Sequence, residues 1–139
     1  MNRTNLKLVF SKGLNIPKKE VDAIVKFSKW VIIELGLKSD VIRMSFLKKD
    51  KMKGHISTGK FDDKTKHIFI RKEDRALIDV LRTIAHEMEH LKQHEEKWKT
   101  SSDNAFGIDW KKEDDAAQVA GRLIKMFVQK FEQQWLYKY

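Results

Sequence analysis

Apolar residues recur at helical spacing through the stretch Leu77-Ile78-Asp79-Val80-Leu81-Arg82-Thr83-Ile84-Ala85-His86-Glu87-Met88-Glu89-His90-Leu91. With Ile84 set at 0° and about 100° per residue, one apolar stripe lies within roughly 60° of Ile84. The members of the stripe are Leu77, Val80, Leu81, Met88 and Leu91. On the same wheel His86 and His90 fall on the opposite side, near about 200° and 240°, with Glu87 at their flank near about 300°. The stretch therefore predicts a helix whose core-facing stripe excludes both histidines.

The five residues His86-Glu87-Met88-Glu89-His90 match the pattern H-E-x-x-H. Histidines at i and i+4 leave one face of a helix and can bind one zinc ion, and the glutamate after the first can serve as a general base. Two ordinary readings compete with metal binding: a pair of hydrogen-bonded core histidines, or a solvated face shared with Glu89 and Gln93. Because neither histidine belongs to the apolar stripe, we predict a metal site at His86 and His90.

A catalytic zinc needs a third protein ligand and an open position. His94 continues the histidine row, but on a straight helix it lies about 12 Å along the axis from His86, too far to share an ion with it. The longer metal-binding pattern that uses a third histidine has a glycine turn, and Leu91-Lys92-Gln93-His94 has none. We expect His94 to be a rim residue.

The other source of a third ligand is the acidic cluster Glu113-Asp114-Asp115, near the start of a helical pattern over 109–136. Glu113 heads a long apolar stripe on this pattern, whereas Asp115 falls near about 200° from it, toward solvent. The stripe consists of Ala116, Ala117, Ala120, Leu123, Ile124, Phe127, Val128, Phe131 and Trp135. An unpaired buried carboxylate is costly and a metal removes that cost, so Glu113 is the predicted third ligand and Asp115 the second choice. The ordinary reading of Glu113 is a helix-start carboxylate that follows an Asp109 cap.

The remaining chain predicts one helix and three strands. A helix begins at Asn15-Ile16-Pro17, with Asn15 as its cap, and ends at Gly36. Strands are predicted at 41–47, 55–61 and 66–71, the last two forming a hairpin, and helices at about 74–97 and 109–136 flank a polar loop at 100–107. We expect an α+β fold: a small, mostly antiparallel three-stranded sheet packed on the histidine-bearing helix, with an N-terminal helix and a long C-terminal helix, all in one domain over 1–139.

Composition limits the class of protein. The 139 residues include no cysteine, which excludes disulfides, thiolate zinc sites and a cysteine nucleophile and fits a cytoplasmic location. No apolar run is long enough for a membrane span, and the first residues lack the apolar core of a secretory signal. The net charge of +9 makes nucleic acid a candidate partner, with one tight basic cluster at Lys48-Lys49-Asp50-Lys51-Met52-Lys53.

With the motif at 86–90 followed by Glu113-Asp114-Asp115-Ala116-Ala117-Gln118-Val119-Ala120, the chain resembles compact gluzincin-type metallopeptidases, in particular the ImmA/IrrE-like and phage-encoded ones. The resemblance covers about residues 66–125. It implies that His86, His90 and Glu113 bind zinc, that Glu87 is the catalytic base, and that the strand before the active helix is the sheet edge on which an extended substrate lies. The SprT-like proteases linked to DNA are a second comparison, but their third ligand is usually histidine.

The sequence therefore predicts a zinc-dependent peptide hydrolase acting on a peptide or protein substrate, with Glu87 as the general base and Lys66–Arg71 as the strand that binds peptide. The alternative is a nucleic-acid-associated or regulatory binding protein with a structural or vestigial zinc site. Four residues are candidates for the oxyanion donor: Tyr137, Tyr139, Arg82 and His94.

Overall fold

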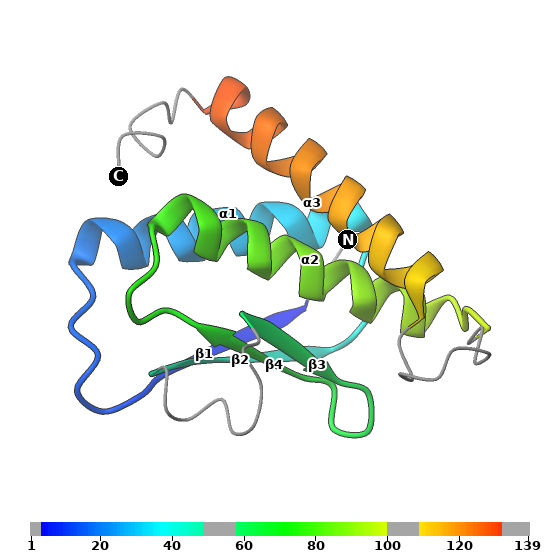
Figure 1. Cartoon of the computed structure of the whole chain (residues 1–139), viewed down its shortest axis with the longest axis horizontal. Coiled ribbons are helices and arrows are strands. Elements are labelled where there is room, and N and C mark those ends of the chain that lie inside the picture. The colour runs from blue at the N-terminus through cyan, green and yellow to red at the C-terminus, as the bar shows by residue number, and fades with distance from the viewer. Residues whose placement is uncertain (1–3, 49–57, 100–108, 132–139) are drawn as a thin grey trace.

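A computed structural model describes residues 4–48, 58–99 and 109–131 of the chain. The elements are, in chain order, β1 (Asn5–Phe10), α1 (Lys18–Leu35), β2 (Val41–Leu47), β3 (Gly59–Asp62), β4 (His67–Arg71), α2 (Leu77–Glu95) and α3 (Trp110–Lys130). In Figure 1, α1 and α2 cover one face of the sheet and α3 lies over them. None of the described helices has an apolar stretch long enough to span a membrane.

The sheet corrects the predicted architecture. Within the described ranges it has four strands in the order β1-β2-β4-β3, in which β1, β2 and β4 are parallel and β3 alone is antiparallel to its neighbour β4. The overall class is still α+β, but the predicted mostly antiparallel three-stranded sheet is wrong. The physical reason lies in the missed strand β1: α1 connects β1 to β2, and a helical crossover joins neighbouring strands in parallel.

The order of the strands also places the edge of the sheet at a different strand from the one predicted. The predicted hairpin is present, with Gly59 opposite Ile70 and Asp62 opposite His67. However, β4 lies between β2 and β3, so the edge strand beside α2 is β3 and not the segment at 66–71.

Alternation along the strands sends one row of side chains toward the helices. In β1 this row is Leu6, Leu8 and Phe10, which stand opposite Ile42, Met44 and Phe46 of β2. The ring of Phe10 stacks on that of Phe46, with the ring centroids 4.9 Å apart. The same alternation places Asn5, Lys7 and Val9 on the other, exposed face of β1.

Helix α1 begins and ends close to where the sequence indicates. Its N-cap is Pro17 and no side chain caps it, so the predicted Asn15 cap is wrong by two positions. At the other end Gly36 adopts φ 62°, a left-handed conformation that glycine tolerates, and its N–H bonds to the carbonyls of Ile32 and Ile33.

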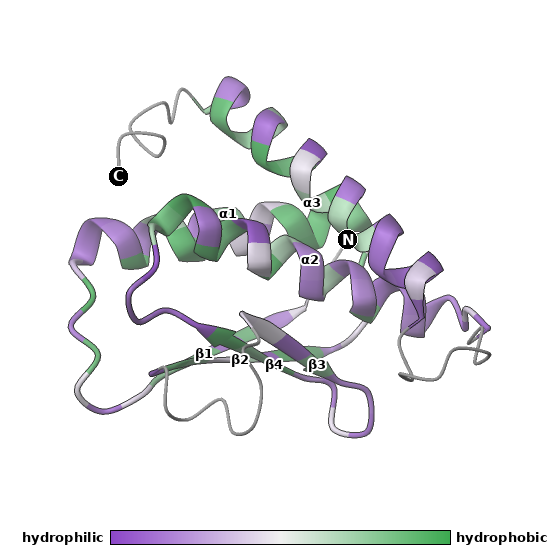
Figure 2. Cartoon of the chain, viewed as in Figure 1, coloured by the Kyte–Doolittle hydropathy of each residue, from purple (hydrophilic) through white to green (hydrophobic). Residues whose placement is uncertain are grey.

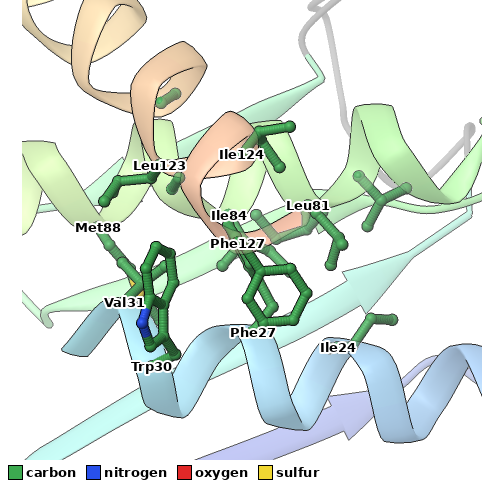
Figure 3. Close-up of a cluster of buried hydrophobic side chains, with 14 of the residues drawn as sticks. Ile24, Phe27, Trp30, Val31, Leu81, Ile84, Met88, Leu123, Ile124 and Phe127 are labelled. Carbon is green, nitrogen blue, oxygen red and sulfur yellow. The ribbon is translucent and has the colours of Figure 1, made fainter. Parts of the chain in front are cut away.

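The three helices share one apolar core, drawn in Figure 3. Phe127 of α3 meets Phe27 of α1 edge-on at a centroid distance of 5.0 Å, and its centroid is 5.5 Å from that of Trp30. The predicted stripe of α3 is buried from Ala116 to Val128, except that Ala117 is exposed and Val119 is buried instead. The hydrophobic side of α3 thus faces α1 and α2, as its colouring in Figure 2 also shows.

Several predicted features lie outside the described residues. They are most of the basic cluster at 48–53, the start of the strand at 55–61, the loop at 100–107, the end of the helix at 109–136, and Tyr137 and Tyr139.

Candidate metal centre

His86 and His90 lie one turn apart on α2, on the side of the helix that faces the first turn of α3. Their ring centroids are 4.9 Å apart, and their side chains keep 26% and 17% of their surface exposed. The predicted apolar stripe of α2 is buried in the core, so the two histidines stand clear of it. The helix therefore fixes the positions of the two rings, and part of each ring remains exposed to solvent.

Glu113 completes the group from the first turn of α3. Its Oε2 atom lies 2.6 Å from Nε2 of His90 and 3.4 Å from Nε2 of His86. One ligand atom from each of the three side chains lies within 4.8 Å of the others, so this group could hold a metal ion. The side chain of Glu113 is 39% exposed, so it is less buried than its place at the head of the apolar stripe predicts.

Local sequence explains how α3 delivers Glu113. The side chain of Asp109 accepts a hydrogen bond from the N–H of Lys112 at 3.2 Å, which fixes the start of the helix. One turn further on, Ala116 and Ala120 are fully buried, and their small side chains allow α3 to lie close to α2. The Asp109 cap and the cluster of Glu113 with the two histidines are both present, so the helix-start role and the proposed ligand role of Glu113 are compatible.

The electrostatics of the group follow from one shared carboxylate. Hydrogen bonds from His86 and His90 hold the pKa of Glu113 well below its usual range. Burial alone would lower the pKa of His90, but its bonds to Glu113 and Gln93 outweigh burial and raise that pKa to about 8. His90 and Glu113 thus favour the charged forms of each other.

Glu87 lies beside this group and is only 6% exposed. Burial raises the pKa of its carboxyl group to about 7, an effect that the neighbouring histidines partly oppose. A carboxyl group with a pKa near neutrality can both accept and release a proton at physiological pH.

The alternative ligands do not join the group. His94 is exposed and its ring lies 5.9 Å from that of Phe61, and it is not a member of the three-residue cluster. Asp115 also stands outside, but the expectation that it faces solvent is wrong. It accepts a hydrogen bond from Nε2 of Gln93 at 2.9 Å and shares another with Glu89.

The solvated-face reading of α2 is also wrong, because Glu89 and Gln93 are 3% and 2% exposed. Burial, and then the bond with Asp115, raise the pKa of Glu89 to about 8. Burial and the neighbouring Asp115 thus both favour the protonated form of Glu89, which can donate to Asp115. For Asp115, burial alone would raise the pKa, but the bonds from Glu89 and Gln93 lower it.

Two cavities adjoin the histidines, and both are lined by Gly59, Glu87 and Glu113. One, of about 720 Å³, extends toward Arg71, Arg75 and Arg82; the other, of about 820 Å³, extends toward Phe61, His94 and Trp98. The group at His86, His90 and Glu113 therefore opens onto a cleft that passes the edge strand β3.

Gly59 is a site residue that the sequence analysis missed. A Cβ atom at this position would lie 2.5 Å from Cγ2 of Thr83 and 3.1 Å from Oε2 of Glu87. The available signal was the glycine itself, because glycine inside a strand often marks a close approach of the backbone to another group.

Arg75 was missed as well. Its guanidinium donates to the carbonyl of Arg71 at 2.9 Å, to that of Thr58 at 3.3 Å and to Oγ1 of Thr83 at 2.7 Å. These bonds tie both strands of the hairpin to α2 beside Glu87. Nothing in the sequence distinguishes Arg75 from the other basic residues.

Comparison with protein-family models, curated proteins and solved structures finds no match for this chain. The case for a function therefore rests on the residues of the cleft and their geometry.

Gly59→Ala tests the close approach of β3 to α2. The added methyl group meets Thr83 and Glu87, so we expect a loss of about 1–3 kcal/mol in the free energy of unfolding, measured by urea denaturation. The matched control is Gly121→Ala on the exposed side of α3, where a Cβ meets nothing within 4 Å. This control should be neutral or stabilising by up to about 1 kcal/mol. Equal effects of the two substitutions would contradict the predicted contact.

The pairing of Glu113 with His90 predicts a pH-dependent stability of the metal-free protein. The folded pKa of His90, about 8, exceeds its ordinary 6.5, so the stabilisation is full below pH 6.5 and is lost as the pH rises through about 8. For Glu113 the pKa is lowered, so its own contribution is lost only in acid. With a chelator present, the difference in Tm between wild type and Glu113→Gln should shrink over this interval. A difference that stays constant from pH 6.5 to about 9 would refute the pairing.

Proposed function

We propose that this chain is a zinc-dependent peptide hydrolase. The observation that carries the proposal is the convergence of His86, His90 and Glu113 on one point beside the buried carboxyl group of Glu87. Two imidazole nitrogens and one carboxylate oxygen form a donor set typical of catalytic zinc sites, in which three protein ligands leave a position open. Among the described residues the group has three members, which favours a catalytic site over a structural one closed by a fourth side chain.

When bound by these three residues, zinc supplies Lewis-acid chemistry: it lowers the pKa of water and polarises a carbonyl group. Glu87 carries out the proton transfers. Its carboxylate accepts a proton from water as the water oxygen bonds to the scissile carbonyl carbon. The same carboxyl group then returns that proton to the leaving nitrogen as the C–N bond breaks, which yields a carboxylic acid and an amine. A pKa near 7 suits both steps.

The substrate proposed for this cleft is an extended peptide that pairs with the edge strand β3. β3 lines both cavities, so a strand added along it would pass the three ligands. β3 takes the place that the sequence analysis gave to the segment at 66–71. Of the predicted oxyanion donors, Arg82 lines one cavity and His94 the other.

The resemblance to compact gluzincin-type metallopeptidases supports the same reaction, since it assigns the same roles to the same four residues. The competing proposal is a regulatory or nucleic-acid-associated protein with a structural zinc, which the net charge of +9 favours. The two differ in a direct assay: a peptidase cleaves a casein or peptide pool only with zinc, whereas a nucleic-acid protein binds DNA with a steep salt dependence.

The ligand set predicts how zinc content responds to substitution. Wild type should bind about one zinc ion per chain, and His86→Ala, His90→Ala and Glu113→Ala should each bind little at micromolar free zinc. Zinc is measured by elemental analysis after purification without added metal, and affinity by competition with a chelating dye. The controls are His94→Ala and Asp114→Ala, both exposed and outside the group, which should match wild type. Zinc content unchanged by the three ligand substitutions would overturn the site.

Glu87→Gln separates chemistry from binding. The amide is nearly isosteric with the carboxyl group but cannot accept the proton, so hydrolysis should fall by at least about 10²-fold while zinc content and Tm stay near wild type. Activity is followed on a fluorogenic peptide pool. If the variant lost zinc together with activity, Glu87 would be a ligand and not the base; if it kept full activity, another group would be the base.

A further inference from the structure

Gln93 is a buried amide one turn beyond His90 on α2. It is only 2% exposed, and a buried amide is stable only when its donors and acceptor find partners. Three partners are present, each at 2.9 Å: Oε1 faces Nδ1 of His90, and Nε2 faces both the backbone carbonyl of Lys112 and Oδ2 of Asp115.

These partners leave one orientation for the amide. The carbonyl of Lys112 and the carboxylate of Asp115 are acceptors, so only the NH₂ group of Gln93 can face them. The amide oxygen must then face His90, and an oxygen acceptor requires a proton on Nδ1 of His90. In the metal-free protein Nε2 also carries a proton and donates it to Oε2 of Glu113. In the neutral ring, the form that binds a metal, the proton that stays on Nδ1 leaves the lone pair on Nε2.

The same amide joins the two helices that carry the ligands. Lys112 directly precedes Glu113 in the first turn of α3, and its carbonyl is held by Gln93 of α2. The bond therefore fixes the distance between the turn that carries His90 and the turn that carries Glu113.

We propose that Gln93 is a positioning residue that fixes His90 in the tautomer with Nε2 free for the metal and clamps the Glu113 turn to α2. This inference rests on the proposed metal site. It adds to that site a residue that neither the motif nor the ligand cluster includes. Gln93 is almost fully buried, and its bonds act on the ring of His90 and on the backbone before Glu113.

Gln93→Met tests the role, because methionine has nearly the same length but offers no comparable donor or acceptor. We expect zinc affinity to fall by about 10–100-fold, the usual effect of removing a hydrogen-bond partner of a ligand. The matched control is Gln118→Met, an exposed glutamine on α3, which should bind zinc as wild type does. Circular dichroism and thermal unfolding of the zinc-loaded proteins establish that each variant is folded.

The second measurement reads the tautomer and needs no variant. In zinc-loaded wild type, long-range ¹H–¹⁵N NMR should show His90 protonated at Nδ1 and metal-bound through Nε2, with the Nδ1 proton protected from exchange. Gln93→Glu, which keeps the acceptor but loses both donations, should keep the Nδ1–H signal. In Gln93→Met the Nδ1 proton of His90 should no longer be protected from exchange.

The outcomes separate this inference from the function on which it rests. Absence of zinc from wild type would remove the proposed metal site, and the inference with it. If wild type binds zinc with His90 ligated through Nδ1, or if Gln93→Met binds zinc as tightly as wild type, the positioning role alone is wrong.

Discussion

The contact between the first turn of α3 and the histidine-bearing turn of α2 is the interaction on which the site depends. Neither helix holds the complete group: α2 supplies two imidazoles and α3 supplies the carboxylate. The packing that brings them together is apolar and distant from the chemistry, since Phe127 meets Phe27 and Trp30 at the other end of α3. The small residues Ala116 and Ala120 then allow the near end of α3 to reach α2. Ordinary core packing thus determines where Glu113 lies.

Acidic groups with different environments surround the two histidines. Glu113 is held ionised by its two imidazole partners, whereas burial keeps the pKa of Glu87 near 7. Two carboxyl groups in one cleft whose pKa values are shifted in opposite directions are typical of sites in which one group binds a ligand and the other transfers protons. Glu89 and Asp115 form a second acidic pair beside the two histidines and Glu113, and Gln93 connects that pair to His90.

The helical parts of the fold could be predicted from the sequence because helical periodicity is a local property. The apolar stripe of α2, the Asp109 cap and the glycine that ends α1 are all where local rules indicate. The sheet was predicted wrongly because strand order is not local. β1 was missed although Leu6, Leu8 and Phe10 alternate, and without it the crossover through α1 and the parallel pairing could not be inferred.

In the candidate site, too, local patterns could be predicted and contacts between distant elements could not. The helical wheels predicted His86, His90 and Glu113 as ligands. The structure places these three side chains together. Their role in binding metal stays a prediction. The wheel of α3 predicted that Asp115 faces solvent. A wheel for one helix cannot show that this side of the first turn of α3 faces Glu89 and Gln93 of α2. Gly59 lies at a contact between β3 and α2, and Arg75 bonds from the connection before α2 to Arg71 of β4 and Thr83 of α2; no periodicity encodes such contacts between distant elements.

X-ray absorption spectroscopy of the zinc-loaded protein tests the central claim most directly, because it reports the ligands of the metal without a substrate. The account predicts one zinc ion per chain, with two imidazole nitrogens at about 2.0–2.1 Å and the remaining positions filled by oxygen. A first shell with three imidazoles, or one without histidine, would contradict the assignment of His86, His90 and Glu113.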